Sequence, residues 1–293
     1  MSTLSTTTPL SIDRKVIAEG YRDRSMTADD YSNKQSSGGI VLMGVGEMGG
    51  VFARGFLAAG HSVHPLRRSD DPGATARNVP DPVLVPVTVG ETDLDEALDS
   101  LPERWADRLL LIQNELLPAT WLAHGISRPT VAVVWFEKKP GQDVKVILST
   151  PVAGSGAGLV VSALDGIGIP SHIVSQGTGL EFELVRKNLY ILTANITGLD
   201  TGGTVAAMWD EHRALAESVA GDVLDMQEHL VGHALDRPAV VEGMVEAIEG
   251  DPEHKTTGRS APARLRRAID HADAASLPVP TLRDIARRHV VSS

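Results

Sequence analysis

Three glycines with the spacing G-x-G-x-x-G are the residues whose pattern points most directly to chemistry. Gly44, Gly46 and Gly49 follow the apolar run Ile40–Met43, and a helical pattern over Met48–Ala59 begins among them. A strand that leads through such a loop into a helix presents backbone amides and the helix N-terminus to phosphate. The motif therefore predicts a dinucleotide site; the alternative is a glycine-rich turn without a ligand.

Each glycine has a separate role in this prediction. The first allows a tight turn, the second lets a pyrophosphate approach the backbone, and the third lets the helix pack closely on the strand. An inward carboxylate would repel phosphate, so we expect the side chain of Glu47 to point to solvent. The residues expected to bind the cofactor are Gly44, Val45, Gly46, Glu47, Met48 and Gly49.

Two arginines bear on which dinucleotide is bound. Arg67 and Arg68 directly follow the expected second strand, where NAD enzymes carry an acid for the ribose 2′-hydroxyl. Guanidinium groups instead suit a 2′-phosphate. We therefore expect NADP(H), with both arginines as phosphate ligands. The alternative is surface charge paired with Asp70 and Asp71.

A lysine on an apolar helix is the strongest candidate for acid–base chemistry. Lys187 shares one stripe with Ile191, Ala194 and Asn195 in the helical pattern of Leu184–Asn195. Burial on this stripe would lower the pKa of the ammonium and allow proton exchange near neutral pH. The alternative is a lysine at the helix edge whose ammonium extends to solvent.

The elements that must position these groups fall into two unlike halves. Up to about residue 175 strands and helices alternate, which predicts an α/β Rossmann domain with a doubly wound parallel sheet. Helices are expected over Met48–Ala59, Leu94–Leu101 and Leu159–Leu164. The expected strands are Ile40–Met43, Ser62–Leu66, Val83–Val89, Leu109–Gln113, Thr130–Phe136, Val144–Thr150 and His172–Ser175.

The second half has only helical patterns, so we expect an all-helical C-terminal domain. Its expected helices are Leu180–Asn195, Val205–His233 with a break at Gly221, Arg237–Gly250 and Ala263–Ala275. The resulting organisation is a flexible N-terminal extension at 1–38, an NADP-binding Rossmann domain at 39–177 and a helical domain at 178–293.

Composition excludes several classes of function. The formal net charge of −11 disfavours nucleic acid and anionic membranes as partners. The chain has no cysteine, which excludes thiolate catalysis and disulfides, and no spacing predicts a metal site. No apolar run approaches the ~18 residues of a membrane span, and a signal peptide is not evident. We therefore expect a cytoplasmic protein that acts on a small molecule.

From Ile40 to Arg288 the chain resembles the ketopantoate reductase family, within the 6-phosphogluconate and 3-hydroxyacid dehydrogenase superfamily. The glycine loop and the arginine after the second strand carry the likeness, as does Leu111–Asn114, which resembles the family's L-x-x-N-G segment. Leu184–Asn195 resembles the lysine helix of the family, and Ala263–Pro280 resembles its closing helix.

This resemblance implies a reaction in which the nicotinamide delivers hydride to a carbonyl carbon. Lys187 would be the catalytic general acid that protonates the carbonyl oxygen. Asn114 would hold both nicotinamide and substrate, and Asn195 would hydrogen-bond the substrate. The resemblance also implies a homodimer, with the helical domain providing substrate contacts and the dimer interface.

Four positions depart from the family pattern, and all lie in its substrate site. Ile191 replaces an asparagine, Gly90 falls where a lysine is usual, and Glu115 replaces the glycine after Asn114. Ser260 falls near the position where the family carries the acid that binds the substrate hydroxyl. A site that loses polar partners loses discrimination, so we expect another 2-oxo acid, a bulkier ketone or an imine in place of ketopantoate. Candidates to line a reshaped pocket are Trp135, His254 and Arg259.

Three functions are open at this point. The leading one is an NADP-dependent oxidoreductase that reduces a carbonyl. The missing polar groups motivate a second, a non-catalytic NADP-binding protein with a regulatory or partner-binding role. The third is a specialised reductase of an imine or another biosynthetic intermediate, in which the N-terminal extension covers the site of a neighbouring subunit.

Overall fold

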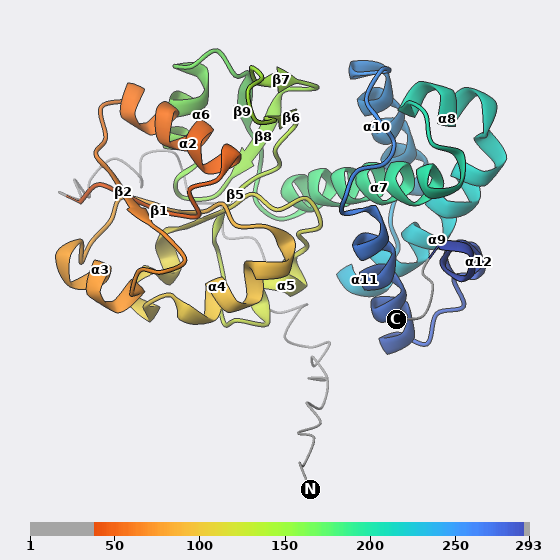
Figure 1. Cartoon of the computed structure of the whole chain (residues 1–293). Coiled ribbons are helices and arrows are strands. Elements are labelled where there is room, and N and C mark those ends of the chain that lie inside the picture. Colours follow the sequence, from red (N-terminus) through yellow and green to blue (C-terminus); the bar gives the residue numbers. More distant parts are fainter. Residues whose placement is uncertain (1–37, 290–293) are drawn as a thin grey trace, which may run out of the picture.

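The structure, a computed structural model, describes residues 38–289. The flexible extension expected at 1–38 therefore falls outside the described residues, apart from its last position. One sheet of seven strands has the order β2-β1-β3-β4-β5-β8-β9 (Figure 1). The strands are β1 (Ile40–Met43), β2 (Val63–Leu66), β3 (Val85–Val87), β4 (Leu109–Leu111), β5 (Thr130–Ala132), β8 (Thr150–Ala153) and β9 (Ser171–Ile173).

The direction of the strands divides the sheet. The five strands from β2 to β5 run parallel, so their carboxyl ends share one edge. β8 pairs antiparallel with β5, and β9 runs parallel to β8. In the parallel part, the loops that follow β1, β3 and β4 come together at that edge, which is where ligands of open α/β sheets bind.

Helices cover both faces of the sheet (Figure 1). Ile40 and Leu42 of β1 belong to an apolar cluster with Phe52 and Phe56, whereas Val41 belongs to the cluster on the opposite face. This alternation explains why β1 is apolar at every position, since each face needs its own packing residues. α2 (Glu47–Ala58) and α6 (Ala157–Asp165) lie on one face; the other carries α3 (Pro72–Asn78), α4 (Leu94–Ser100) and α5 (Pro118–Leu122).

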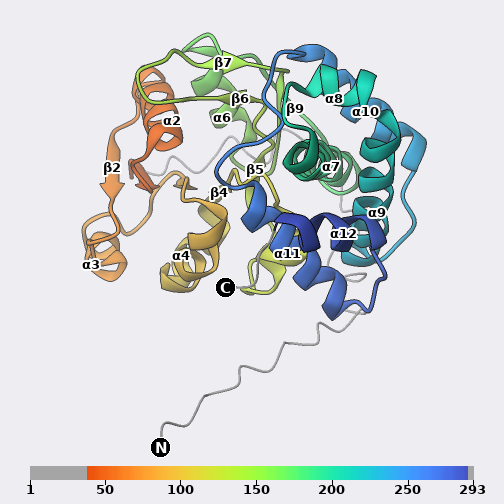
Figure 2. The same cartoon turned by 45° about the vertical axis from the view of Figure 1, so that its right-hand side comes forward.

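A long central helix organises the second half. α7 (Thr178–Thr201) is buried without interruption over residues 184–198, as expected of a helix with neighbours on all sides. α9, α10 and α11 pack around it (Figure 2). The other helices of this half are α8 (Val205–Glu211), α9 (Arg213–Val231), α10 (Arg237–Gly250), α11 (Ala261–Ala274) and α12 (Pro280–His289).

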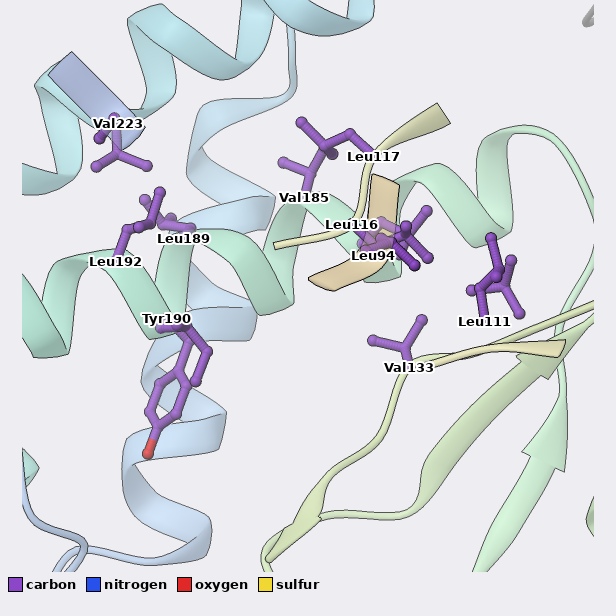
Figure 3. Close-up of a cluster of buried hydrophobic side chains, with 14 of the residues drawn as sticks. Leu94, Leu111, Leu116, Leu117, Val133, Val185, Leu189, Tyr190, Leu192 and Val223 are labelled. Carbon is purple, nitrogen blue, oxygen red and sulfur yellow. The ribbon is translucent and has the colours of Figure 1, made fainter. Parts of the chain in front are cut away.

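The two halves share an apolar core. Leu94 and Leu111 come from the Rossmann half, and Val185 and Leu189 lie on α7 in the same cluster of buried side chains (Figure 3). Val223 of α9 continues this cluster into the helical half. Burial of apolar surface therefore holds the lysine helix directly against the carboxyl edge of the parallel strands.

The predicted fold class is confirmed: a mainly parallel, doubly wound sheet is followed by helices alone in the described residues. The predicted helix break at Gly221 is wrong. The helical stretch is interrupted at His212, whose φ of −121° and ψ of 29° depart from helical values, and Gly221 lies inside α9. A glycine there costs only about 1 kcal/mol relative to alanine, and the burial of Val219 and Val223 offsets it.

The strand expected over Val144–Thr150 is also wrong, because this segment is divided. Its first part forms β7 (Lys145–Val146), which pairs with β6 (Phe136–Glu137) as a small hairpin. The amides of Ile147 and Leu148 then both donate to the carbonyl oxygen of Trp135, at 2.8 and 3.2 Å. The chain turns at this point and enters the sheet as β8. Within residues 38–289 no helix has the length and apolarity needed to cross a membrane.

Candidate active site

The first and third glycines of the loop are required by its geometry. Gly44 has a φ of +88°, and a Cβ there would lie 3.0 Å from the carbonyl carbon of Thr88. A Cβ on Gly49 would lie 2.1 Å from the Gly44 oxygen, so any side chain would push α2 away from β1. The hydroxyl of Thr88 donates to that same oxygen at 2.5 Å and ties the loop to the end of β3.

The middle glycine leaves the loop open. Gly46 is exposed at the N-cap of α2, and nothing lies within 4 Å of a Cβ built there. The first amides of α2 have no partner within the helix, which together with the open glycine fits a pyrophosphate. Glu47 turns aside, since its carboxylate pairs with the ammonium of Lys138 at 3.0 Å.

A hollow of about 690 Å³ lies beside this loop, on the side of the β6–β7 hairpin. Its walls come from α2, from the hairpin and from the turn before β9. Val45 and Gly46 also line it, so the hollow adjoins the middle of the glycine loop. The lining residues are Val45, Gly46, Glu47, Gly50, Val51, Arg54, Lys138, Asp143, Val144, Val146, Ile167, Gly168 and Ile169.

Both arginines after β2 are exposed and paired with acids. The Nε of Arg67 lies 3.3 Å from the carboxylate of Asp70, and a terminal nitrogen of Arg68 lies 2.6 Å from that of Asp93. The partner of Arg68 comes from the segment before α4, whereas the alternative drawn from the sequence paired the two arginines with Asp70 and Asp71. Exposed ion pairs contribute at most about 1 kcal/mol, so these pairs do not prevent either guanidinium from binding a phosphate.

Lys187 lies on the buried part of α7, and its side chain is only 5% exposed. Its ammonium lies 4.0 Å from the centroid of the Trp135 ring and 5.9 Å from that of Tyr190. No hydrogen bond or ion pair joins this ammonium to another described residue. Burial, and secondly the charge of Arg264, lower the pKa of Lys187 to about 7 although the carboxylate of Glu91 opposes the shift.

Asn114 is fixed at the end of β4 by its neighbours. Its backbone amide donates to the carboxylate of Glu91 at 3.0 Å. The side-chain amide of Gln113 donates to the carbonyl oxygens of Val87 and Val89 at 2.8 and 3.1 Å, which ties the ends of β3 and β4 together. The loops after these two strands are therefore held as one rigid edge.

Arg264 of α11 connects that edge to the lysine helix. It donates to the carboxylate of Glu115 at 3.0 Å and to the side-chain oxygen of Asn195 at 2.7 Å. A third nitrogen of the same guanidinium lies 3.8 Å from Glu91. Arg267, one turn further along α11, also binds Glu115, at 2.9 Å. The expected site residue Asn195 thus faces the same cluster as the loop that carries Asn114.

The three candidates for a reshaped pocket have different surroundings. Trp135 is fully buried and packs on Tyr190, with ring centroids 5.5 Å apart. His254 lies beyond Tyr190, 6.5 Å between ring centroids, and burial lowers its pKa. Arg259 is exposed before α11 and makes no ion pair or hydrogen bond to a described residue. The structure therefore brings Trp135 and His254 near Lys187 and leaves Arg259 outside the cluster.

Comparison with solved structures identifies the fold. A 2-dehydropantoate 2-reductase from Methylococcus capsulatus matches with a TM-score of 0.62 at 12% identity, over 85% of this chain and 94% of that one. A dimeric ketopantoate reductase from Staphylococcus aureus matches with a TM-score of 0.59 at 16% identity, over 86% and 97%. The chain has the ketopantoate reductase fold. D-mandelate dehydrogenase in complex with NADH also matches, with a TM-score of 0.57 at 13% identity over 86% and 97%.

The likeness is one of structure, because no protein-family model and no curated protein sequence matches the chain. Within the ketopantoate reductase fold, sequence reasoning missed the roles of Glu91 and Arg264. Neither belongs to a local motif, and 149 positions separate Arg264 from its partner Glu115. The one available signal was Glu115, which stands where the ketopantoate reductase family has a glycine. A partly buried carboxylate needs a cation nearby, and Arg264 is such a cation. Among the described residues no three acidic or histidine side chains are grouped as metal ligands.

Proposed function

We propose that this protein is an NADP(H)-dependent oxidoreductase that reduces a carbonyl group, with Lys187 as the proton donor. The observation that carries the proposal is a buried lysine without a hydrogen-bond partner among residues 38–289, held at the carboxyl edge of a Rossmann sheet. A general acid is most effective when its pKa is near the working pH, and the pKa of about 7 meets this condition.

The residues of the loop and of the β2 end fit the cofactor. We propose that the first amides of α2 and the open backbone at Gly46 bind the pyrophosphate, and that Arg67 and Arg68 bind the 2′-phosphate. The reduced nicotinamide supplies the hydride when bound. Asn114 follows β4 at the same edge and would orient the nicotinamide and the substrate. The solved relative with NADH supports a pyridine nucleotide; the preference for NADP rests on the two arginines.

The proton and hydride steps balance without another reactant. Hydride passes to the carbonyl carbon, the C=O π electrons move to oxygen, and the ammonium of Lys187 gives that oxygen a proton, which yields an alcohol. The lysine is left neutral, a state that its low pKa makes accessible, and it is protonated again from water. Arg264, whose charge acts on Lys187, and Asn195, which is bound to Arg264, would contact the oxygens of a 2-oxo acid or a related ketone.

One observation favours the second function, a non-catalytic NADP-binding protein. The ring of Trp135 lies on the ammonium of Lys187, and the oxygen of Asn195 is already bound by Arg264. The oxygen of Asn195 is therefore occupied within the protein, and the charge of Lys187 is stabilised there without a substrate. A protein of this kind would bind NADPH tightly and consume none of it with any carbonyl or imine.

We also propose a homodimer, because a relative of the same fold is described as a dimeric ketopantoate reductase. Light scattering during size-exclusion chromatography measures the mass directly. A mass near twice the 31.1 kDa of the chain supports the dimer, and a mass near 31.1 kDa contradicts it.

NADPH consumption against a panel of 2-oxo acids, ketones and cyclic imines tests the catalytic proposal. The variant Lys187→Met should lower kcat about a thousandfold, because the transition state loses its proton donor, while the Kd for NADPH stays unchanged. Lys139→Met is the matched control, since Lys139 is half-exposed, pairs with Glu137 and is not among the charges that act on Lys187. Full activity of Lys187→Met contradicts the role of the lysine, and tight NADPH binding without turnover of any panel member favours the second function.

A further inference from the structure

Trp135 presents the nearer of the two aromatic rings that lie beside the ammonium of Lys187. The centroid of its ring lies 4.0 Å from the nitrogen, and the ring is fully buried. The guanidinium carbon of Arg186 lies 5.2 Å from the same ring. A cation at such a distance from an aromatic face is attracted by the ring quadrupole, and the attraction is strongest for tryptophan and where water is excluded.

The backbone around Trp135 holds the ring in place. Its amide donates to the hydroxyl of Thr150 at 3.2 Å, and its carbonyl accepts from Ile147 and Leu148. The ring of Tyr190, one turn along α7 from the lysine, packs against the indole at an interplanar angle of 58°. Contacts with the sheet side and with α7 therefore both hold the indole in place, and the fold itself maintains its contact with Lys187.

Among the described residues, Tyr190 offers the other aromatic face near this ammonium, and its ring centroid is more distant, at 5.9 Å against 4.0 Å for Trp135. The charged or titratable groups that act on Lys187 are Glu91 before α4, Arg186 on α7, Arg264 on α11 and His254 after α10. Three of them are cationic or become so, and the carboxylate of Glu91 binds the amide of the β4 loop. A buried ammonium is ordinarily held by a carboxylate, which would occupy its N–H bonds and raise its pKa.

We propose that Trp135 is a positioning residue for Lys187: its indole face holds the ammonium at the sheet edge and leaves the N–H bonds free for a substrate oxygen. An aromatic face attracts the charge of the ammonium without taking a proton donor into a fixed hydrogen bond. The consequence for catalysis rests on the proposed function, whereas the contact itself is measured without turnover.

Lysine NMR tests the contact directly. The chain has seven lysines, so ¹³C-labelled lysine gives a resolvable set of ε signals, and Lys187→Arg identifies the one from Lys187. The ring current of Trp135 should shift that signal upfield in the native protein. We expect the shift to persist in Trp135→Phe and to fall in Trp135→Leu to the smaller contribution of the Tyr190 ring, whose centroid lies 5.9 Å from the ammonium. Should the leucine variant fail to fold, Trp135→Met provides a similar volume without a ring.

The same samples give the pKa of Lys187 by pH titration. Removing the aromatic face removes an attraction for the charged form, so the pKa of Lys187 should fall in Trp135→Leu. In Trp135→Phe it should lie between the values of the native protein and of the leucine variant. Trp209→Leu is the matched control, because the Trp209 ring lies 4.0 Å from the guanidinium of Arg213 and is not one of the two rings beside Lys187. An ordinary ε shift in the native protein overturns the proposal. So does an unchanged or raised pKa in Trp135→Leu, since a rise means that Trp135 only excludes water.

Kinetics add the catalytic consequence. With a carbonyl substrate, Trp135→Leu should lower kcat about tenfold or more, with Trp135→Phe much closer to the native enzyme and the Kd for NADPH unchanged in both. An unaltered kcat in the leucine variant overturns the positioning role. If the native protein reduces no carbonyl, the proposed function fails, and the NMR comparison still decides whether Trp135 holds the lysine.

Discussion

At the scale of single residues, Lys187 is defined by what surrounds its ammonium. Transfer out of water disfavours the charged form, and the nearby guanidinium of Arg264 disfavours it further. The carboxylate of Glu91 and the face of Trp135 act in the opposite direction. The balance leaves a lysine that exchanges its proton near neutral pH, a property useful for catalysis and costly for folding.

The direction of the pH dependence follows from the proposed role of Lys187 as the proton donor. As a proton donor Lys187 must be charged, so kcat for carbonyl reduction should be highest below pH 7 and decline as pH rises through the pKa of about 7. Oxidation of the product alcohol needs the neutral amine and should show the opposite trend. Rates at saturating substrate across neutral pH measure both limbs, and a reduction rate that rises through neutral pH contradicts the assignment.

The same pKa predicts an effect on stability. The unfolded chain keeps the lysine protonated up to its ordinary value of 10.5, whereas the folded chain releases that proton above about 7. The contribution of Lys187 to the free energy of unfolding therefore rises with pH between these values. Lys187→Met should be more stable than the native protein by a few kcal/mol below pH 7, and the difference should shrink towards pH 10. Urea unfolding of both proteins at several pH values measures the difference; a methionine variant that is less stable at low pH contradicts it.

At the scale of elements, Glu115 joins the loop after β4 to α11. Its carboxylate binds both Arg264 and Arg267, and Arg264 in turn binds Asn195 on α7. Three segments that are distant in sequence are thus connected through one partly buried carboxylate. The position that carries a glycine in the family is here a tie between the sheet edge and the helical half.

Loss of the Glu115 carboxylate should lower the stability of the protein and also weaken substrate binding. Glu115→Gln leaves the buried guanidinium of Arg264 without its strongest counter-charge, which should cost about 3 kcal/mol of unfolding free energy. The loss should also raise KM for the carbonyl substrate, because Asn195 and Arg264 are no longer held. Arg266→Gln provides the control, as Arg266 is exposed on the same helix. Equal stability of Glu115→Gln and Arg266→Gln in urea would show that the tie contributes nothing.

At the scale of the whole molecule, the sequence predicted those elements whose position depends on nearby residues in the chain. The glycine loop and α10 lie where their own residues indicate, since strand, turn and helix signals coincide there. Three helices outside the predicted set, α3, α5 and α12, each begin with proline, and α3 also has Asp71 as N-cap. The Asp-Pro pair was a usable signal, because an N-cap acid before proline favours a helix start.

Contacts between distant segments were beyond prediction from one sequence. The helix break moved from Gly221 to His212 because packing of α9 on α7 outweighs the weak preference of a glycine. The stripe on α7 left open whether Lys187 is buried or extends to solvent, and neither the indole above it nor the charges around it could be derived from spacing. Asn114 and Asn195 entered through the resemblance to a family, and the arginine that lies between them came only from the structure.

The shared core predicts how the molecule unfolds and how a cofactor alters this. Apolar side chains of β4, α4, α7 and α9 form one cluster, and Glu115 adds polar ties, so both halves should unfold in a single transition (Figure 3). At a hundredfold excess over Kd, NADPH should stabilise the folded state by about 2.7 kcal/mol and raise Tm by roughly 5–10 °C. NADH at the same concentration should raise Tm less, and Arg68→Gln should remove most of that difference, while Arg77→Gln, also exposed and paired with an aspartate, should not. Calorimetry that resolves two transitions, with only one shifted by NADPH, would mean that the halves unfold independently despite their common core.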